Sequence, residues 1–279
     1  MNDVRTGVID QMVVNMARLI ENGDFLAEGI GTFMPNAAYI LARHMHAPDG
    51  MTLCPNGNAL TTGTRRMTLG RDERATTRGS MLIDYADINL TYMPMLFVAH
   101  KARWTEFMRP AQIDAWGWTN NVCIGRYDRP TIRLPGAAGI PDATPTAHRL
   151  YYYVPRHTPR VFVRELDFAS GAGNPRPGQL GPVRRITVIT ELCVLESGVD
   201  GRLALARLNP GVTRDEVVAA TGFDLAMAAD VDEMAPPTNE ERALLDEEID
   251  PQGLRYLEAL SGAARREAIR AIAAREEPT

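Results

Sequence analysis

The feature that most constrains the fold is a glycine-rich segment at residues 133–144, which reads RLPGAAGIPDAT. Its two glycines stand three positions apart with two alanines between them, and a proline lies on each side. The following HRLYYYVPRHTPRVFV is rich in aromatic and β-branched residues and predicts one or two strands. Because glycine has no Cβ, such a turn can bring backbone N–H groups close to a ligand. The spacing is equally typical of a tight connection in an α/β domain.

The amino-terminal part of the chain alternates between helix and strand signals. Apolar residues recur near the helical period over 5–21, and Asn22-Gly23-Asp24 is typical of a turn. A short buried strand is predicted over 25–31. Pro35 stands near the start of a second predicted helix, where no hydrogen bond needs its missing N–H. This order of elements indicates the βα pattern of an open α/β sheet.

The carboxy-terminal half carries strand signals and then helix signals. Residues 186–196, ITVITELCVLE, predict one strand, and 197–201 predict the hairpin turn after it. Thr213 and Thr238 each stand three residues before a glutamate, which predicts a capping box at the start of two helices. The prolines before residue 238 divide the chain into a predicted α/β domain, 1–237, and a predicted helical extension, 238–279. We expect this extension to pack on the domain or on a partner.

Composition and charge argue against several classes of protein. The net charge of -5 argues against a nucleic-acid-binding protein, which usually carries a basic surface. No run of about eighteen apolar residues is present, so no membrane span is expected. The amino terminus lacks the pattern of a secretory signal. Cys54, Cys123 and Cys193 are widely spaced and form no CxxC metal motif, which fits a reducing cytoplasm and predicts no metal site.

Four segments carry a recognisable pattern in a characteristic order. They are ENGDFLAEGIGTFMPNAAYILARHMHAPD, AQIDAWGWTNNVCIGRYDRPTIRLPGAAGIPDAT, RVFVRELDFASGAG, and LNPGVTRDEVVAATGFDL followed by PPTNEERALLDEEIDPQGL. Together they cover most of residues 15–255, and the chain resembles the beta subunit of family I CoA-transferases, nearest to glutaconate CoA-transferase. The resemblance implies an open α/β fold with a mostly parallel sheet and helices on both faces. It also implies an obligate alpha subunit of related fold and a site at the interface between the subunits.

The chemistry of that family gives the glycine-rich segment a role. A glutamate attacks an acyl-CoA thioester, CoA becomes attached to that glutamate, and a second carboxylate reverses the sequence. Each tetrahedral intermediate carries an oxyanion, which N–H donors of a glycine loop can stabilise. The substrates implied are thus an acyl-CoA and a small carboxylate, with no bound cofactor.

The family loop reads G-x-G-G-A-x-D, and its counterpart here departs from that pattern at two positions. Ala138 stands where a glycine is usual, and alanine disfavours a positive φ. Pro141 removes one donor N–H. We expect the loop to line the pocket with altered hydrogen-bonding capacity. The resemblance implies that the substrate or CoA is bound by Gly136, Ala137, Ala138, Gly139, Ile140 and Asp142, together with Asn56 and Gly57 of a second turn.

A more serious departure lies in that second turn, after the strand predicted within 51–60. The family nucleophile is a glutamate followed by Ser or Asn and then Gly, and its position falls here on Pro55. Proline cannot act as a nucleophile, so the catalytic residue is unassigned. The same absence marks relatives similar to ring-opening CoA-thioester hydrolases of bacterial steroid degradation. There the resemblance implies that the alpha subunit supplies the catalytic acid.

Three functions therefore remain open. The first is the beta subunit of an enzyme that transfers CoA between an acyl-CoA and a carboxylic acid. The second keeps the fold but changes the reaction to CoA-thioester hydrolysis or hydrolytic C–C cleavage, as Pro55 suggests. The third is a subunit without catalytic groups that scaffolds its partner.

Other side chains have both a functional and a structural interpretation. Cys54 could accept an acyl group, but a small buried side chain at a strand end is the simpler interpretation. Gln112 and Asp114 match a family segment that we interpret as support for a turn. We interpret the tryptophans near the loop, Trp116 and Trp118, as packing residues. We interpret the histidines as core or surface residues: His44, His46, His100, His148 and His157. We interpret the arginine-rich loop as solvated rather than bound to CoA phosphates; its arginines are Arg65, Arg66, Arg71, Arg74 and Arg78.

Overall fold

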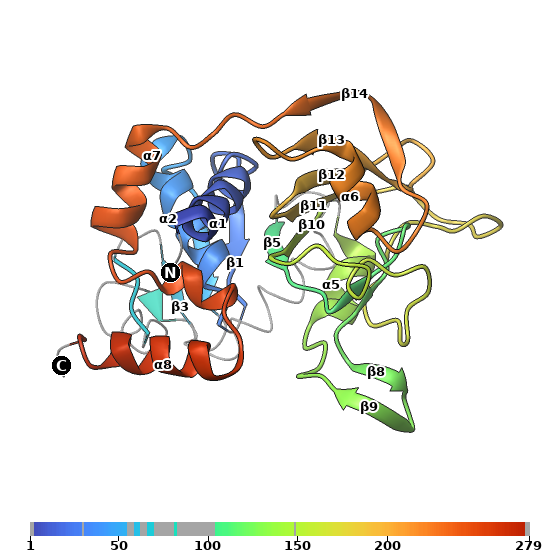
Figure 1. The fold of residues 1–279 in the computed structure, drawn as a ribbon, viewed down its shortest axis with the longest axis horizontal. Helices are drawn as coiled ribbons and strands as arrows, with labels where there is room; N and C mark the ends of the chain where they lie inside the picture. Colours follow the sequence, from blue (N-terminus) through green and yellow to red (C-terminus); the bar gives the residue numbers. More distant parts are fainter. Residues whose placement is uncertain are drawn as a thin grey trace. The chain divides into compact units, whose positions relative to one another are not determined.

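The computed structural model describes residues 3–29, 31–54, 59–61, 66–69, 81–82, 104–147 and 149–276 (Figure 1). The chain divides into two compact units. Unit 1 comprises Met1–Met95, Ala102–Phe107 and Pro237–Thr279, and unit 2 comprises Leu96–Lys101 and Met108–Pro236. The predicted division into an α/β domain, 1–237, and a helical extension, 238–279, stays a prediction.

Unit 1 combines the amino-terminal βα elements with the carboxy-terminal helices. Its described elements are α1 (Asp3–Ala17), β1 (Phe25–Ala27), α2 (Phe33–Met45), β2 (Met51–Cys54), β3 (Ala59–Thr61), β4 (Met81–Leu82), β5 (Trp104–Met108, whose last residue belongs to unit 2), α7 (Asn239–Ala243), a π-helical turn η2 (Leu244–Ile249), a 3-10 turn η3 (Leu254–Glu258) and α8 (Gly262–Ala273).

The sheet of unit 1 is parallel at its centre. β1 pairs in parallel with β2 and with β5, so Ala27 stands opposite both Leu53 and Glu106. β3 and β4 extend the sheet by antiparallel pairing. Helix α2 is buried along almost its whole length, and the Tyr39 hydroxyl donates a hydrogen bond of 2.8 Å to the carbonyl of Ala27. A buried helix thus fixes the position of β1.

The carboxy-terminal part of the chain contacts segments that come much earlier in the sequence. Glu258 accepts a hydrogen bond of 2.8 Å from the backbone N–H of Met34, in the first turn of α2. The backbone N–H of Met67 donates to the carbonyl of Ile249 at 2.7 Å. Glu276 accepts from the N–H of Leu69 at the same distance. Hydrogen bonds between segments far apart in the sequence therefore help to hold unit 1 together.

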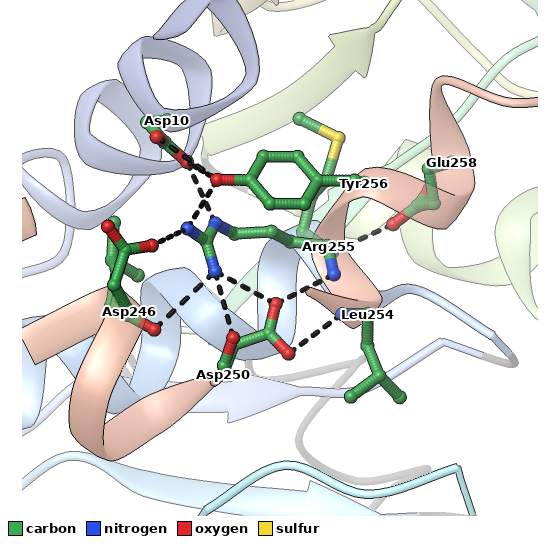
Figure 2. A network of polar contacts seen from close by, with 9 residues as sticks. Asp10, Asp246, Asp250, Leu254, Arg255, Tyr256 and Glu258 are labelled. Atoms are coloured by element: carbon green, nitrogen blue, oxygen red, sulfur yellow. Dashed lines mark hydrogen bonds and ion pairs between the residues drawn. The ribbon is translucent and has the colours of Figure 1, made fainter. Parts of the chain in front are cut away.

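Arg255 of η3 is buried and ion-paired on three sides (Figure 2). Its guanidinium lies 2.8 Å from Asp10 of α1 and 3.1 Å from Asp250, and it also contacts Asp246. Asp250 accepts further hydrogen bonds of 2.8 Å from the backbone N–H groups of Leu254 and Arg255. Burial alone would lower the pKa of Arg255, but the surrounding acids raise it, so the guanidinium stays charged. These contacts offset the desolvation of buried ions and join α1 to η2 and η3.

Unit 2 is built around five neighbouring strands, in the order β14-β13-β12-β11-β10. β10 is parallel to β11 and β13 to β14, whereas the pairs β11–β12 and β12–β13 are antiparallel. The described elements are β6 (Gln112–Ile113), β7 (Thr119–Asn120), β8 (Cys123–Arg126), β9 (Arg129–Arg133), α5 (Ile140–Thr146), β10 (Arg149–Val154), β11 (Arg185–Thr190), β12 (Cys193–Ser197), β13 (Leu203–Leu208), α6 (Arg214–Ala220) and β14 (Ala226–Glu233).

The predicted α/β class and the helical carboxy-terminal region are confirmed. Both capping boxes are present: Thr213 and Glu216 exchange hydrogen bonds at α6, and Thr238 and Glu241 do so at α7. The single strand predicted over 186–196 is wrong. The structure divides it into β11 and β12, because the Thr190 hydroxyl accepts from the N–H groups of residues 192 and 193 and turns the chain.

Candidate functional site

The glycine-rich segment forms a loop of residues 134–139 between the β8–β9 hairpin and α5, here called the glycine loop. Its first half is held by backbone hydrogen bonds. The N–H of Leu134 donates to the carbonyl of Val122 at 3.0 Å, and the N–H of Gly136 donates to the carbonyl of Asn121 at 3.1 Å. The hairpin therefore sets the position at which the loop begins.

Two residues of the loop have a positive φ. Gly136 has a φ of 113°, which glycine adopts readily, and Ala138 has a φ of 46°. Among the described residues, Ala138 is the only residue other than glycine with a positive φ. A left-handed conformation costs an L-residue about 1–2 kcal/mol. The loop thus keeps a glycine-like conformation at the position where the sequence carries alanine, and the strain stays in the loop.

The backbone donors in the middle of the loop are uncommitted. Within the described part of the chain, the N–H groups of Ala137, Ala138 and Gly139 donate no hydrogen bond. Successive N–H groups near a left-handed residue can form a concave site for an anion. Free backbone N–H donors are the kind of group that can stabilise an oxyanion.

The segment after the loop is packed tightly from behind. The Thr144 hydroxyl of α5 accepts a hydrogen bond of 2.8 Å from the N–H of Ala172, and Arg184 donates to the carbonyls of Thr144 and Gly173. A Cβ placed on Gly171 would lie 2.8 Å from Cγ2 of Ile140. Gly171 of the SGAG segment is therefore needed for close contact with α5, which supports the glycine loop.

The turn between β6 and β7 is held by a buried carboxylate. Asp114 accepts from the N–H of Trp116 at 2.9 Å and from the N–H of Trp118 at 3.0 Å, and it pairs with Arg176 at 2.6 Å. A Cβ on Gly173 would lie 2.4 Å from the backbone of the same turn. The structure thus gives Asp114 the supporting role that the sequence predicts.

A pocket of about 450 Å³ lies at the carboxyl end of β10. Its walls include Leu134 and Pro135, which lead directly into the glycine loop, and Val154, the last residue of β10. Arg109 and Arg156 also line it, and no acidic residue does so among the described residues. Ligands of open α/β sheets bind outside the carboxyl ends of parallel strands, which makes this pocket the natural candidate.

Asn121 connects the pocket to the loop. Its backbone carbonyl accepts from Gly136, and its side-chain Nδ2 donates to the carbonyl of Arg109 at 2.8 Å. That hydrogen bond fixes the orientation of the amide, so Oδ1 is the free end. Oδ1 is buried and has no hydrogen-bond partner among the described residues. A buried acceptor without a partner is unfavourable in the free protein.

The predicted site residues have different environments. Ile140 packs against the hydrophobic core of unit 2, so its side chain does not belong to the pocket. Asp142 is exposed, and its carboxylate makes no contact among the described residues. Pro55, Asn56 and Gly57 lie outside the described residues, as do four of the five loop arginines, while Arg66 donates to the carbonyl of Glu247. Cys54 is the last residue of β2.

Sequence reasoning did not single out Arg109, Asn121 and Arg156. Each arginine stands beside a proline at the end of a strand, in FMRP after β5 and VPRH after β10. A cation that directly follows a predicted parallel strand is the signal that could have identified them. Asn121 lies in a run of polar residues without any periodic signal.

Glu106, His157 and Cys193 are among the groups of the described chain whose pKa values are strongly shifted. Burial raises the pKa of Glu106 to about 7. Burial lowers the pKa of His157 to about 3, and the neutral ring lies between the hydroxyls of Thr190 and Thr221 at 3.1 and 3.0 Å. Burial raises the pKa of the Cys193 thiol to about 12. His157 and Cys193 are therefore structural groups rather than a base and a nucleophile.

Two general properties of the described residues concern membranes and metal ions. No helix in the described ranges is long and apolar enough to cross a membrane. The described residues also contain no cluster of three or more His, Cys, Asp or Glu side chains that could hold a metal ion.

Comparisons with known proteins place these features in context. A family model described as "Coenzyme A transferase" matches residues 9–220. The chain is 30% identical to the B subunit of the 3-oxoadipate CoA-transferase of Pseudomonas knackmussii, over 91% of this chain and 94% of that protein. It is 36% identical to the cholesterol ring-cleaving hydrolase IpdB subunit of Rhodococcus jostii over 52% of this chain and 58% of that one. Its fold is similar to the crystal structure of the decarboxylase AibA/AibB, with a TM-score of 0.77, 26% identity and coverage of 92% and 99%.

Proposed function

Because the chain belongs to the coenzyme A transferase family, we propose that it is the beta subunit of an enzyme that moves CoA between an acyl-CoA and a carboxylic acid. The single observation that carries this proposal is the set of free N–H groups at residues 137–139, next to a pocket at the carboxyl end of a parallel strand. Those donors suit the oxyanion that forms when a thioester carbonyl is attacked.

The partner in this proposal is an alpha subunit of related fold. The similar relatives are themselves named as subunits, which supports a heteromeric enzyme. This chain has Pro55 at the position of the family glutamate, so it contributes no carboxylate there. The attacking carboxylate therefore comes from the alpha subunit, while the beta subunit contributes the glycine loop and part of the binding pocket.

A second candidate function is hydrolysis, and Pro55 is the observation that favours it. In thioester hydrolysis, water would replace the carboxylate as the acceptor of the acyl group, and CoA and a free carboxylic acid would be released. In C–C hydrolysis, water would add to a ring carbonyl, the neighbouring C–C bond would break to give a carboxylic acid and a protonated carbon, and the thioester would remain. The similarity to the ring-cleaving hydrolase subunit over about half of the chain supports this alternative. The same N–H donors would stabilise the oxyanion, because that intermediate carries the same charge.

The test is an assay of the chain co-expressed with the alpha subunit encoded next to it. Dicarboxylic acyl-CoA thioesters are supplied with or without acetate, and CoA exchange and thioester loss are measured separately. Transfer predicts exchange that depends on the acceptor and a glutamyl-CoA thioester that borohydride reduces during turnover. Hydrolysis predicts thioester loss without acceptor and no borohydride inactivation. Absence of both activities across a broad panel leaves hydrolytic C–C cleavage, which keeps the thioester intact, and the scaffolding role.

We further propose that the enzyme acts in the cytoplasm and uses CoA as a substrate rather than as a resident cofactor. Cys123 and Cys193 are buried free thiols, which agrees with a reducing compartment. Cell fractionation with an antibody against the chain, together with mass spectrometry of the purified complex, tests both statements.

A further inference from the structure

We infer that Arg184 is a positioning residue for the glycine loop. It holds the short helix α5 against the segment 171–173, and α5 in turn sets the direction of the free N–H groups of the loop. Arg184 is not among the residues that line the pocket, so it acts on the reaction through the loop alone. This inference rests on the proposed function, because it assigns Arg184 a role in turnover.

Helix α5 is too short to fix its own position. It has seven residues, and two of them are prolines, Pro141 and Pro145. Pro145 has no N–H to donate to the carbonyl four residues earlier, so the helix lacks one of its few internal hydrogen bonds. A helix of this length is marginal in water without tertiary contacts. The place of α5 in the fold therefore depends on side chains from other segments.

The glycine loop is bound directly to the first turn of α5. The N–H of Ile140 donates to the carbonyl of Ala137 at 2.9 Å, and the N–H of Ala143 donates to the carbonyl of the residue at 139 at the same distance. Because a peptide group is planar and trans, a bound carbonyl of Ala137 also fixes the direction of the N–H of Ala138. A displacement of α5 therefore redirects a donor of the proposed oxyanion site.

Arg184 joins the other end of α5 to a neighbouring segment. Its guanidinium donates to the carbonyl of Thr144, in the last turn of α5, and to the carbonyl of Gly173. The last carbonyls of a helix have no partner within the helix, and a cation is favourable there. The backbone of Arg184 is held as well, since its N–H donates to the buried Asn174 side chain at 2.7 Å and its carbonyl accepts from that side chain at 3.1 Å.

No ion pair accounts for an arginine at this position. Within the described part of the chain, the guanidinium of Arg184 contacts carbonyl groups and pairs with no carboxylate. Its side chain is partly buried, and this burial lowers its pKa. A desolvated cation without a counter-ion is unfavourable, and carbonyl groups offset only part of that cost. The contacts of Arg184 thus fix geometry more than they stabilise the fold.

The test measures kcat and KM of the complex with its alpha subunit, in the turnover assay of the proposed function. Arg184→Gln should lower kcat about 10- to 100-fold and change the KM for acyl-CoA less than about twofold, because the loop is displaced and the pocket is not. Arg184→Lys keeps the charge and can reach one of the two carbonyls, so it should recover part of the loss. Arg185→Gln changes the neighbouring, exposed arginine and should leave kcat as in the wild type.

Thr144→Val tests the same contact without changing a charge. The Thr144 hydroxyl accepts from the N–H of Ala172 at 2.8 Å and donates to the carbonyl of Ile140 at 2.7 Å. The Thr146 hydroxyl, in its contacts with described residues, bonds only within α5. We expect Thr144→Val to lower kcat and Thr146→Val to leave it unchanged. Thermal unfolding shows which variants remain folded, and this pair decides the question if Arg184→Gln does not.

A kcat of Arg184→Gln equal to that of Arg185→Gln, in a folded complex, would overturn the inference. A raised KM with an unchanged kcat would do so as well, because it would assign Arg184 to substrate binding. A wild-type complex without activity would instead overturn the proposed function. Crystal structures of the wild-type and Arg184→Gln complexes then decide the positioning role: a displaced α5 supports it, and an unmoved α5 and loop refute it.

Discussion

The Arg255 network of unit 1 and the glycine loop of unit 2 differ in whether their polar groups have partners. Around Arg255, the buried carboxylates of Asp10 and Asp250 are paired with the guanidinium or with backbone N–H groups (Figure 2). In and beside the glycine loop, three N–H groups and Asn121 Oδ1 have no partner within the described chain, and Ala138 is strained.

The difference separates stability from binding capacity. A polar group that is fully paired stabilises the fold but has nothing left to offer a ligand. A polar group left unpaired is unfavourable in the free protein, and binding can recover that free energy. We therefore expect substitutions in the network to change unfolding, and substitutions in the loop to change turnover.

We expect the largest change in stability from a substitution in the Arg255 network. Arg255→Met keeps much of the side-chain volume but leaves Asp10 and Asp250 buried without a cation. We expect it to lower the free energy of unfolding by about 3–5 kcal/mol, measured by denaturant titration. Arg126→Met breaks an exposed pair with Asp128 and should change stability by less than about 1 kcal/mol. Equal effects of the two substitutions would contradict the comparison.

Glu106 contrasts with the carboxylates of the Arg255 network, because its burial is not offset by a cation among the described residues. Its pKa is about 7 in the folded chain, against an ordinary glutamate value of 4.5. Between these values the folded state holds a proton that the unfolded state releases, so stability falls as pH rises, by at most about 3 kcal/mol.

Glu106→Gln should remove that dependence and be more stable than the wild type above pH 7. Free energies of unfolding at pH 5, 6, 7 and 8 measure the slope. Glu165→Gln, at an exposed position, should leave the slope as in the wild type. A slope that persists in Glu106→Gln would show that another group titrates.

Gly136 tests the loop directly. A Cβ there would meet no neighbour within 4 Å, so Gly136→Ala introduces strain from its φ of 113° and no collision. We expect a loss of about 1–2 kcal/mol of stability or a displaced loop, and in either case a lower kcat in the complex. Gly178→Ala, at an exposed position with a φ of 84° and equally open surroundings, should cost similar stability without lowering kcat.

We expect the smallest effect at Ala138, where a substitution should raise stability instead of lowering it. Ala138→Gly removes the strain of a left-handed alanine and should raise stability by up to about 1 kcal/mol. Ala137→Gly, one residue earlier and without a positive φ, should lower stability by about 0.5–1 kcal/mol. Thermal unfolding of the two variants, which carry the same chemical change, provides the measurement. A lower stability for both would show that the strain at Ala138 is absent.

Local signals in the sequence predict the local parts of this fold. The two capping boxes depend on residues three positions apart, so Thr213 and Glu216 can be found without any tertiary information. The turn at Asp114 is predicted for the same reason. The division of 186–196 into two strands depends on the hydroxyl of Thr190, and a composition rich in β-branched residues conceals it.

The site is predicted less completely because its parts come from separate segments. The glycine loop, with Ala138 as its unusual residue, is visible in the sequence and in the family pattern. The pocket combines Arg109, Asn121 and Arg156 with the wall formed by residues 134 and 135. These segments meet only when β10 and the β8–β9 hairpin are in place, so neither spacing nor periodicity can reveal the pocket.

The discontinuous composition of unit 1 has a consequence for synthesis on the ribosome. The hydrogen-bond partner of Met34 is Glu258 and that of Asp10 is Arg255, and in each case the partner is synthesised more than 200 residues later. Most of unit 2 is a continuous stretch, Met108–Pro236, which emerges before those partners do. Since domains generally fold as units while the chain is made, we expect the nascent amino-terminal helices to stay incompletely packed until Arg255 and Glu258 have left the ribosome.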